Sequence, residues 1–162
     1  MAIDFTALLA FYPSYAASGM VTRLVYGESQ CDVNTTIGTV VKQACRQYAL
    51  DRRALANAAH FVCGKRNLVP LPLCVGRTFV PLKVHAPLID GDSAYGYFLL
   101  QAIVRVEAGE GGSMLYLAGG VTLPILQRRS TAMNHLARAA LFEKVFWGKR
   151  LGAAMGGGVF MG

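Results

Sequence analysis

Basic residues occur in pairs along this sequence, and such pairs can bind phosphate groups. The four pairs are Arg52-Arg53, Lys65-Arg66, Arg128-Arg129 and Lys149-Arg150. Each is expected near the end of a helix or strand, where a guanidinium or ammonium group suits contacts with a nucleic-acid backbone. Arginine also suits insertion into the narrow minor groove of A/T-rich DNA, where the potential is most negative. Exposed pairs of this kind also occur as purely solvating residues, and that alternative stays open at this point.

The last predicted helix adds a polar flank, because Asn134 and Arg138 are four residues apart and share one side of it. Asparagine amides can read base edges. Single basic residues within other predicted elements complete the set. The candidate DNA-binding residues are Arg46, Arg52, Arg53, Lys65, Arg66, Arg77, Lys83, Arg128, Arg129, Asn134 and Arg138.

The motifs of the common enzyme classes do not occur. There is no G-x-S-x-G elbow, P-loop, dinucleotide fingerprint or H-E-x-x-H. His85, Asp90 and Asp92 share a loop region, and a closed pocket lined by them would favour a small-molecule-binding β-rich domain or an enzyme. No nucleophile or oxyanion device accompanies them. The sequence therefore predicts a protein that is not an enzyme and needs no cofactor, and a non-catalytic protein-interaction domain is the other alternative.

The four cysteines carry no metal-binding pattern. Cys31, Cys45, Cys63 and Cys74 have no CxxC spacing and no histidine beside them in a ligand pattern, so we expect no metal site. Unpatterned cysteines suit reduced thiols in a cytoplasm. No Lys or Arg precedes Arg23, so the basic region of a signal peptide is missing, and no apolar run is long enough to span a bilayer. We expect a cytoplasmic, nucleoid-associated protein with no membrane partner.

Composition bounds the class of protein and of partner. The chain has 162 residues, of which 54% are hydrophobic and 15% charged, so it fits one folded domain and not a disordered chain. Sixteen Lys and Arg residues against nine Asp and Glu give a net charge of +7. With few charges in total, this surplus must occupy much of the polar surface. Such a surface favours a polyanion, with nucleic acid first and an acidic membrane surface second.

The pattern of apolar residues predicts an α+β domain with antiparallel strands, a partly barrel-like sheet, one central helix and one C-terminal helix. Strands are expected over 5–12, 20–26, 31–34 and 77–84, and on both sides of a turn at 109–112 within 95–129. Residues 68–75 contain Pro70 and Pro72 and are expected to form an edge segment. We expect a single domain over 1–150 and a flexible glycine-rich tail over 151–162.

Helical spacing predicts two helices. The first runs from an N-cap at Thr35 or Thr36 to about Leu50, with Arg52 and Arg53 just after its C-terminal end, while 54–59 is a loop or a helical turn. The second begins after Ser130 or Thr131. Phe142 and Phe146 fall on another side of it from the main apolar stripe, as a buried end or a self-association face. That stripe consists of Met133, Leu136, Ala137, Ala140, Leu141 and Trp147.

Several short segments occur in an order that resembles the ComK family of competence transcription factors from Gram-positive bacteria. These segments are T-A-L-L-A-F-Y-P from Thr6, A-C-R-Q-Y from Ala44, V-P-L-P-L from Val69, R-T-F-V-P from Arg77, G-Y-F from Gly96, G-G-V-T-L-P-I from Gly119 and R-S-T-A-M-N-H-L-A-R-A from Arg129. The resemblance is collinear from about Thr6 to Lys144. Its order and spacing carry it, since each segment is short and mostly apolar.

The resemblance implies a DNA-binding activator of DNA-uptake genes. Members of the family recognise paired A/T-rich boxes largely through the minor groove, bind as multimers and bend the DNA. It therefore implies double-stranded DNA and further copies of this chain as partners, with a proteolytic adaptor as a third. Arg46, Asn134 and Arg138 match positions in the family pattern. The best-known members carry a longer C-terminal region for adaptor-mediated proteolysis, where this chain has a glycine-rich tail.

Overall fold

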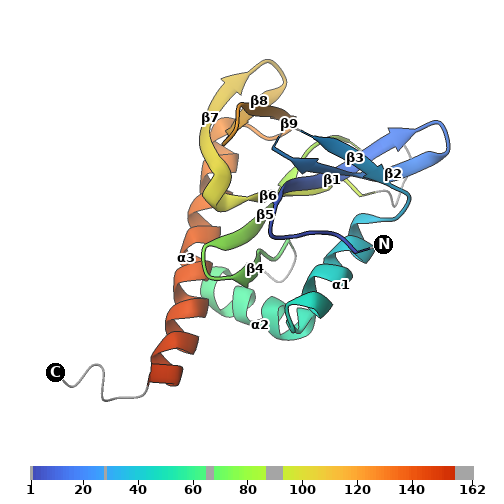
Figure 1. Cartoon of the computed structure of the whole chain (residues 1–162). Helices are drawn as coiled ribbons and strands as arrows, with labels where there is room; N and C mark the ends of the chain where they lie inside the picture. The colour runs from blue at the N-terminus through green and yellow to red at the C-terminus, as the bar shows by residue number, and fades with distance from the viewer. Residues whose placement is uncertain (1, 28, 65–67, 87–92, 156–162) are drawn as a thin grey trace.

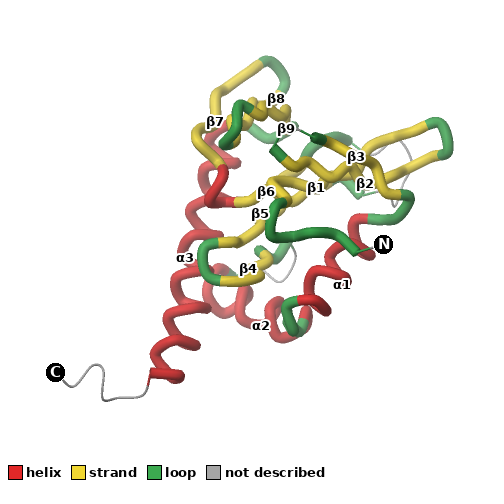
Figure 2. The backbone as a smooth tube through the Cα atoms, viewed as in Figure 1, coloured by secondary structure: helices red, strands yellow, loops and turns green. Residues whose placement is uncertain are grey.

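Two antiparallel sheets and three helices make up the part of the chain that the structure describes (Figures 1 and 2). The computed structural model describes residues 2–27, 29–64, 68–86 and 93–155. The elements in chain order are β1 (Leu8–Ala16), β2 (Gly19–Tyr26), β3 (Gln30–Val33), α1 (Ile37–Gln47), α2 (Arg52–Cys63), β4 (Leu71–Cys74), β5 (Arg77–Lys83), β6 (Tyr95–Leu99), the 3₁₀ turn η1 (Leu100–Ala102), β7 (Ile103–Gly109), β8 (Gly112–Leu117), β9 (Val121–Ile125) and α3 (Arg129–Met155).

The larger sheet has six strands in the order β3-β2-β1-β6-β5-β4, and the smaller has three in the order β7-β8-β9. β1 lies in the middle of the larger sheet, where Ala10 pairs with Phe98 and Phe11 with Tyr97 of β6. The α+β prediction is confirmed. The expectation of a partly barrel-like sheet is wrong, because β3 and β4 remain separate edges of an open sheet.

Alternation along the strands of the larger sheet builds two hydrophobic layers. On β1, Phe11 faces α1 and α2, whereas Ala10 faces the smaller sheet; Phe79 and Val80 on β5 divide in the same way. Because neighbouring residues of a strand point to opposite faces, both faces of this sheet are buried. The helices, the larger sheet and the smaller sheet therefore form three layers, and α3 packs against both hydrophobic clusters.

Two apolar runs differ from what the sequence predicted: one continues through a proline and the other is broken. β1 does not stop at Pro13 but continues through it to Ala16. Proline is tolerated there because β1 pairs with β6 only at Ala10 and Phe11, so the missing N–H of Pro13 is not needed on that side. The run from Tyr95 to Gly109 is broken at η1, and its two halves join different sheets.

Helix α1 forms as expected and ends slightly earlier. The Thr36 hydroxyl accepts a hydrogen bond from the Thr39 N–H at 3.2 Å, which caps the first turn. The buried residues of α1 are Ile37, Val40, Val41, Ala44 and Cys45, at the helical spacing that the sequence indicated.

The expectation of a loop or single turn at 54–59 is wrong, because a second helix, α2, starts at Arg52. The Asp51 carboxylate accepts a hydrogen bond from the Ala54 N–H at 3.0 Å, and Gly64 ends the helix with a φ of 75°. Arg52 and Arg53 therefore stand in the first turn of α2. Their charges oppose its dipole, so the stabilising C-terminal role expected from the sequence does not apply.

Helix α3 buries its Phe142 face and not the main apolar stripe that the sequence predicted. Phe142 and Phe146 pack into the core, whereas Met133 and Leu141 of the expected stripe are 40% and 50% exposed. Both faces of the helix are apolar, and the larger phenylalanine rings fill the space beside β5 and α2. The helix continues to Met155, so the expected tail begins in helix, and 156–162 lies outside the described residues.

Candidate nucleic-acid interface

Several acidic side chains of the described residues are engaged by nearby partners. Asp32 pairs with Arg23 across β2 and β3 at 2.9 Å, and this hydrogen bond lowers the pKa of the Asp32 carboxyl. Glu107 pairs with Arg105 at 3.0 Å on β7. Asp51 caps α2, as described above. These carboxylates are thus committed to local structure and do little to neutralise basic residues elsewhere.

Several candidate arginines are exposed and belong to neither of these pairs. Arg46 on α1, Arg52 and Arg53 on α2, and Arg128 before α3 are all exposed. The two ion pairs found within the described residues include none of them. An exposed guanidinium outside an ion pair can bind phosphate at low desolvation cost.

Arg52 and Arg53 border a groove of about 460 Å³ between α2 and the start of β4. Its described lining also includes Leu68 and Tyr97. Burial raises the pKa of Tyr97, so its phenol stays neutral and contributes no opposing charge at neutral pH. The groove is therefore positively charged at its rim and neutral in its wall.

Leu68 connects this groove to Arg138 on α3. Its backbone has a φ of 59°, and it also borders a small cavity of about 30 Å³ lined by Ala59, His135 and Arg138. Arg52, Arg53 and Arg138, distant in sequence, thus lie around one short segment at residues 68–70. We call these three residues and Leu68 the arginine surface. The candidates Lys65 and Arg66 precede this segment and lie outside the described residues.

Arg128 and Arg129 lie at the N-terminal end of α3. With Ser130 they line a shallow groove of about 580 Å³ beside Gly109 and Gly111 of the β7-β8 turn. The Arg129 Nε donates to the Val106 carbonyl at 2.9 Å, which fixes that side chain against β7. The unpaired N–H groups of the first helical turn add positive potential to the same place.

Four other candidates do not line the two spaces around residues 68–70. Arg77 donates to the carbonyl oxygens of Phe5 and Leu8, both at 2.7 Å, and so holds the N-terminal segment against β5. Lys83 is half-buried where β5 approaches the smaller sheet. Arg46 borders a separate groove beside Ile3. Asn134 is exposed on α3, one turn before Arg138.

The residues that sequence reasoning missed at this interface are Leu68, Tyr97 and His135, which join it through tertiary packing. Neither a motif nor a local spacing connects them to Arg52 or Arg138. The pairing of basic residues indicated Arg52 and Arg53, and the four-residue spacing to Asn134 indicated Arg138.

Within the described part of the chain, no three His, Cys, Asp or Glu side chains are grouped so that they could hold a metal ion. None of the described helices, α3 included, combines the length and apolarity needed to cross a bilayer.

Comparison of the chain with family models, with curated proteins and with solved structures finds no match. The resemblance to the ComK family accordingly stays a prediction.

Proposed function

We propose that this protein binds double-stranded DNA through the arginine surface and through Arg128 at the start of α3. The proposal rests on a contrast between acidic and basic side chains. The carboxylates of Asp32, Asp51 and Glu107 have partners close in the fold. Exposed arginines, in contrast, lie around residues 68–70. A surface of this kind attracts a polyanion and releases counterions when it binds.

The proposed mechanism has two parts. Arginine and lysine first capture the DNA backbone electrostatically, which positions the protein without reading sequence. Arginines then enter the minor groove, where the narrow groove of A/T-rich DNA strengthens the negative potential, so shape is read in place of base edges. Activation of DNA-uptake genes, with bending of DNA that holds paired A/T-rich boxes, is the role that the resemblance to ComK adds to this mechanism.

Binding to two boxes requires more than one copy of the chain, and we place the contact between copies on the exposed face of α3. Phe142 and Phe146 are buried and cannot serve. The opposite side of the helix exposes Met133, Leu141, Val145 and Leu151 by 40 to 50%. A second copy presenting the same stripe would cover apolar surface that otherwise faces water.

Fluorescence anisotropy with labelled duplexes tests the proposal. One duplex carries two A/T-rich boxes, and a control of equal length carries a scrambled G/C-rich sequence; both are titrated over a salt series. We expect tighter binding to the A/T duplex and an affinity that falls steeply as salt rises. Equal affinity for both duplexes would remove the A/T preference. No binding to either duplex would favour the protein-interaction alternative.

A further inference from the structure

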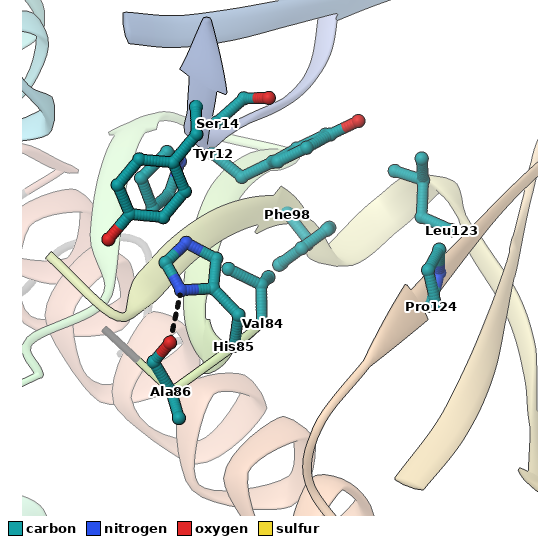
Figure 3. A pocket seen from close by; sticks show the side chains of 10 residues that line it. Tyr12, Ser14, Val84, His85, Ala86, Phe98, Leu123 and Pro124 are labelled. Carbon is teal, nitrogen blue, oxygen red and sulfur yellow. Dashed lines mark hydrogen bonds between the residues drawn. The ribbon is translucent and has the colours of Figure 1, made fainter. Parts of the chain in front are cut away.

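Phe61 on α2 exposes its aromatic ring to solvent almost completely. The residue is 92% exposed, although phenylalanine is among the residues that gain most from burial. Every other aromatic residue that the structure describes is buried or half-buried. Tyr12 and Phe98, for example, stack beside the surface pocket between the two sheets, with ring centroids 6.5 Å apart (Figure 3). The ring of Phe61 therefore adds nothing to the core and is accessible to a partner.

Phe61 shares one side of α2 with Arg53 and Asn57. The three residues follow one another at four-residue spacing and all are exposed. They form a ridge, because a step of four residues turns by only about 40° around a helix with 3.6 residues per turn. Leu55 and Ala59 are buried on the opposite side of α2 and pack into the core. The core thus holds the helix so that the ridge faces solvent.

The helix that carries this ridge has basic residues and no carboxylate. Arg52 and Arg53 lie in its first turn, its own residues include neither Asp nor Glu, and Asp51 just before it is committed to the cap. The basic pair Lys65-Arg66 follows Phe61 closely in the sequence. A single exposed apolar side chain is common on protein surfaces. A ring among cations, however, suits a polyanion that also offers flat apolar faces, and stacked nucleic-acid bases have that chemistry.

We propose that Phe61 inserts between two adjacent base pairs from the minor groove when the arginine surface binds DNA, and so unstacks one base step. The inference rests on the proposed function and adds to it the residue that deforms the duplex. Proteins that bind the minor groove frequently insert an apolar wedge of this kind, which partly unstacks the step and kinks the DNA. Pyrimidine–purine steps such as TA unstack most easily, so the wedge favours A/T-rich boxes that contain one.

The adenine analogue 2-aminopurine, whose fluorescence rises when it is unstacked, tests this with the full chain. It replaces the adenine of each TA step in turn in the duplex with two A/T-rich boxes, and anisotropy on the same duplex measures affinity. We expect the unmodified protein to raise the fluorescence at one step of each box. Phe61→Ala should abolish the rise and weaken binding about tenfold, because one base–aromatic stack is lost. Its salt dependence should be unchanged, because no charge is removed.

Two further variants separate the wedge from other causes. Phe61→Leu keeps an apolar wedge and should retain most of the fluorescence rise. Val104→Ala is the matched control, because Val104 is 64% exposed on β7 and lies outside α2, and it should leave both readouts unchanged. Circular dichroism verifies that each variant is folded, as expected for exposed side chains.

The outcomes distinguish the wedge from the proposed function. Salt-dependent binding of the duplex without a fluorescence rise, or with an equal rise for Phe61→Ala, would overturn the wedge and leave the proposed function standing. No binding to any duplex would overturn both. If Phe61→Ala instead abolishes self-association in analytical ultracentrifugation and keeps the fluorescence rise, the ring serves a contact between copies of the chain and the wedge is overturned.

Discussion

The side-chain amide of Gln101 donates to the carboxylate of Glu143 at 2.6 Å. The Thr78 hydroxyl donates to the same carboxylate, and the Thr78 backbone N–H donates to Gln101 Oε1 at 2.9 Å. A closed triangle of hydrogen bonds thus joins β5, η1 and α3 at the point where the chain passes from one sheet to the other. It fixes the helix that carries Arg138.

Removal of the Glu143 carboxylate should destabilise the fold. Thr78 is fully buried, so Glu143→Ala leaves its hydroxyl unsatisfied, and we expect a loss of about 1–3 kcal/mol in the free energy of unfolding. Glu143→Gln keeps an acceptor and should lose less. Urea denaturation measures both variants. An alanine variant as stable as the unmodified protein would show that the triangle contributes nothing.

Arg77 should affect stability and leave DNA affinity unchanged. Its two hydrogen bonds reach the carbonyls of Phe5 and Leu8, and hydrogen bonds to charged groups contribute about 1.5–3 kcal/mol each. Arg77→Met should therefore lower the urea midpoint, while anisotropy at a temperature where the variant is folded gives the original affinity for DNA. A folded variant with much weaker DNA binding would return Arg77 to the interface.

The double variant Arg52→Ala/Arg53→Ala should weaken DNA binding without loss of helix. Two fewer phosphate contacts should reduce the slope of log affinity against log salt by about 2. Lys42→Ala/Lys149→Ala is the matched control, because it removes the same charge from exposed positions outside the arginine surface and outside the apolar stripe of α3. Circular dichroism checks folding. If the control weakens binding as much, net charge alone governs the affinity and the arginine surface is not specific.

The Arg23–Asp32 pair should make a small, acid-sensitive contribution to stability. The pKa of Asp32 is lower in the folded protein than its ordinary value of 3.8, because Arg23 donates to the carboxylate. Its contribution is therefore present above that value and is lost as pH falls through the lower folded pKa. Both side chains are more than a third exposed, so we expect at most about 1 kcal/mol.

Urea midpoints of the unmodified protein and Asp32→Asn, measured at about pH 7 and about pH 2, check this dependence. The difference between the two proteins should be larger at the higher pH and smaller at the lower. A difference of equal size at both values would assign the effect to something other than the charge of Asp32.

Self-association should depend on the exposed face of α3. Leu141→Asp places a charge in the middle of that face and should shift the protein toward monomer in analytical ultracentrifugation. Val104→Asp is the control, since Val104 is 64% exposed on β7 and outside the α3 stripe. A monomeric unmodified protein at all concentrations, or equal effects of the two variants, would contradict this assignment.

The sequence predicted the elements that are determined by the residues within them. Thr36 and the spacing from Ile37 to Cys45 gave α1, and Pro70 with Pro72 placed β4 at a sheet edge, as observed. The start of α2 was missed although Asp51 caps it, because Arg52 and Arg53 also suit the end of the preceding helix. Which face of α3 is buried depended on the space beside β5 that the Phe142 ring fills. The spacing of apolar residues along a helix does not reveal that space.

In the candidate site, too, some features could be predicted from the sequence and others depend on the fold. Basic pairs identified Arg52 and Arg53, yet their proximity to Arg138 follows from the course of residues 68–70 between α2 and α3. Arg77 has the same residue type and a structural role, set by the carbonyls that it reaches. The surface pocket beside His85 (Figure 3) combines β1, β6, β9 and the segment after β5, which meet only in the folded chain.

The place of β1 in the larger sheet has a consequence for synthesis of the chain. β2 follows β1 directly in the chain, so the two strands can pair as soon as β2 has been synthesised. The other neighbour of β1 is β6, which is synthesised only after both α1 and α2. Until Phe98 emerges from the ribosome, the β1 edge at Ala10 and Phe11 has no partner, and long-range pairing of this kind is slow. A nascent chain stalled before residue 95 should therefore be prone to aggregation and should rely on a chaperone that covers this edge.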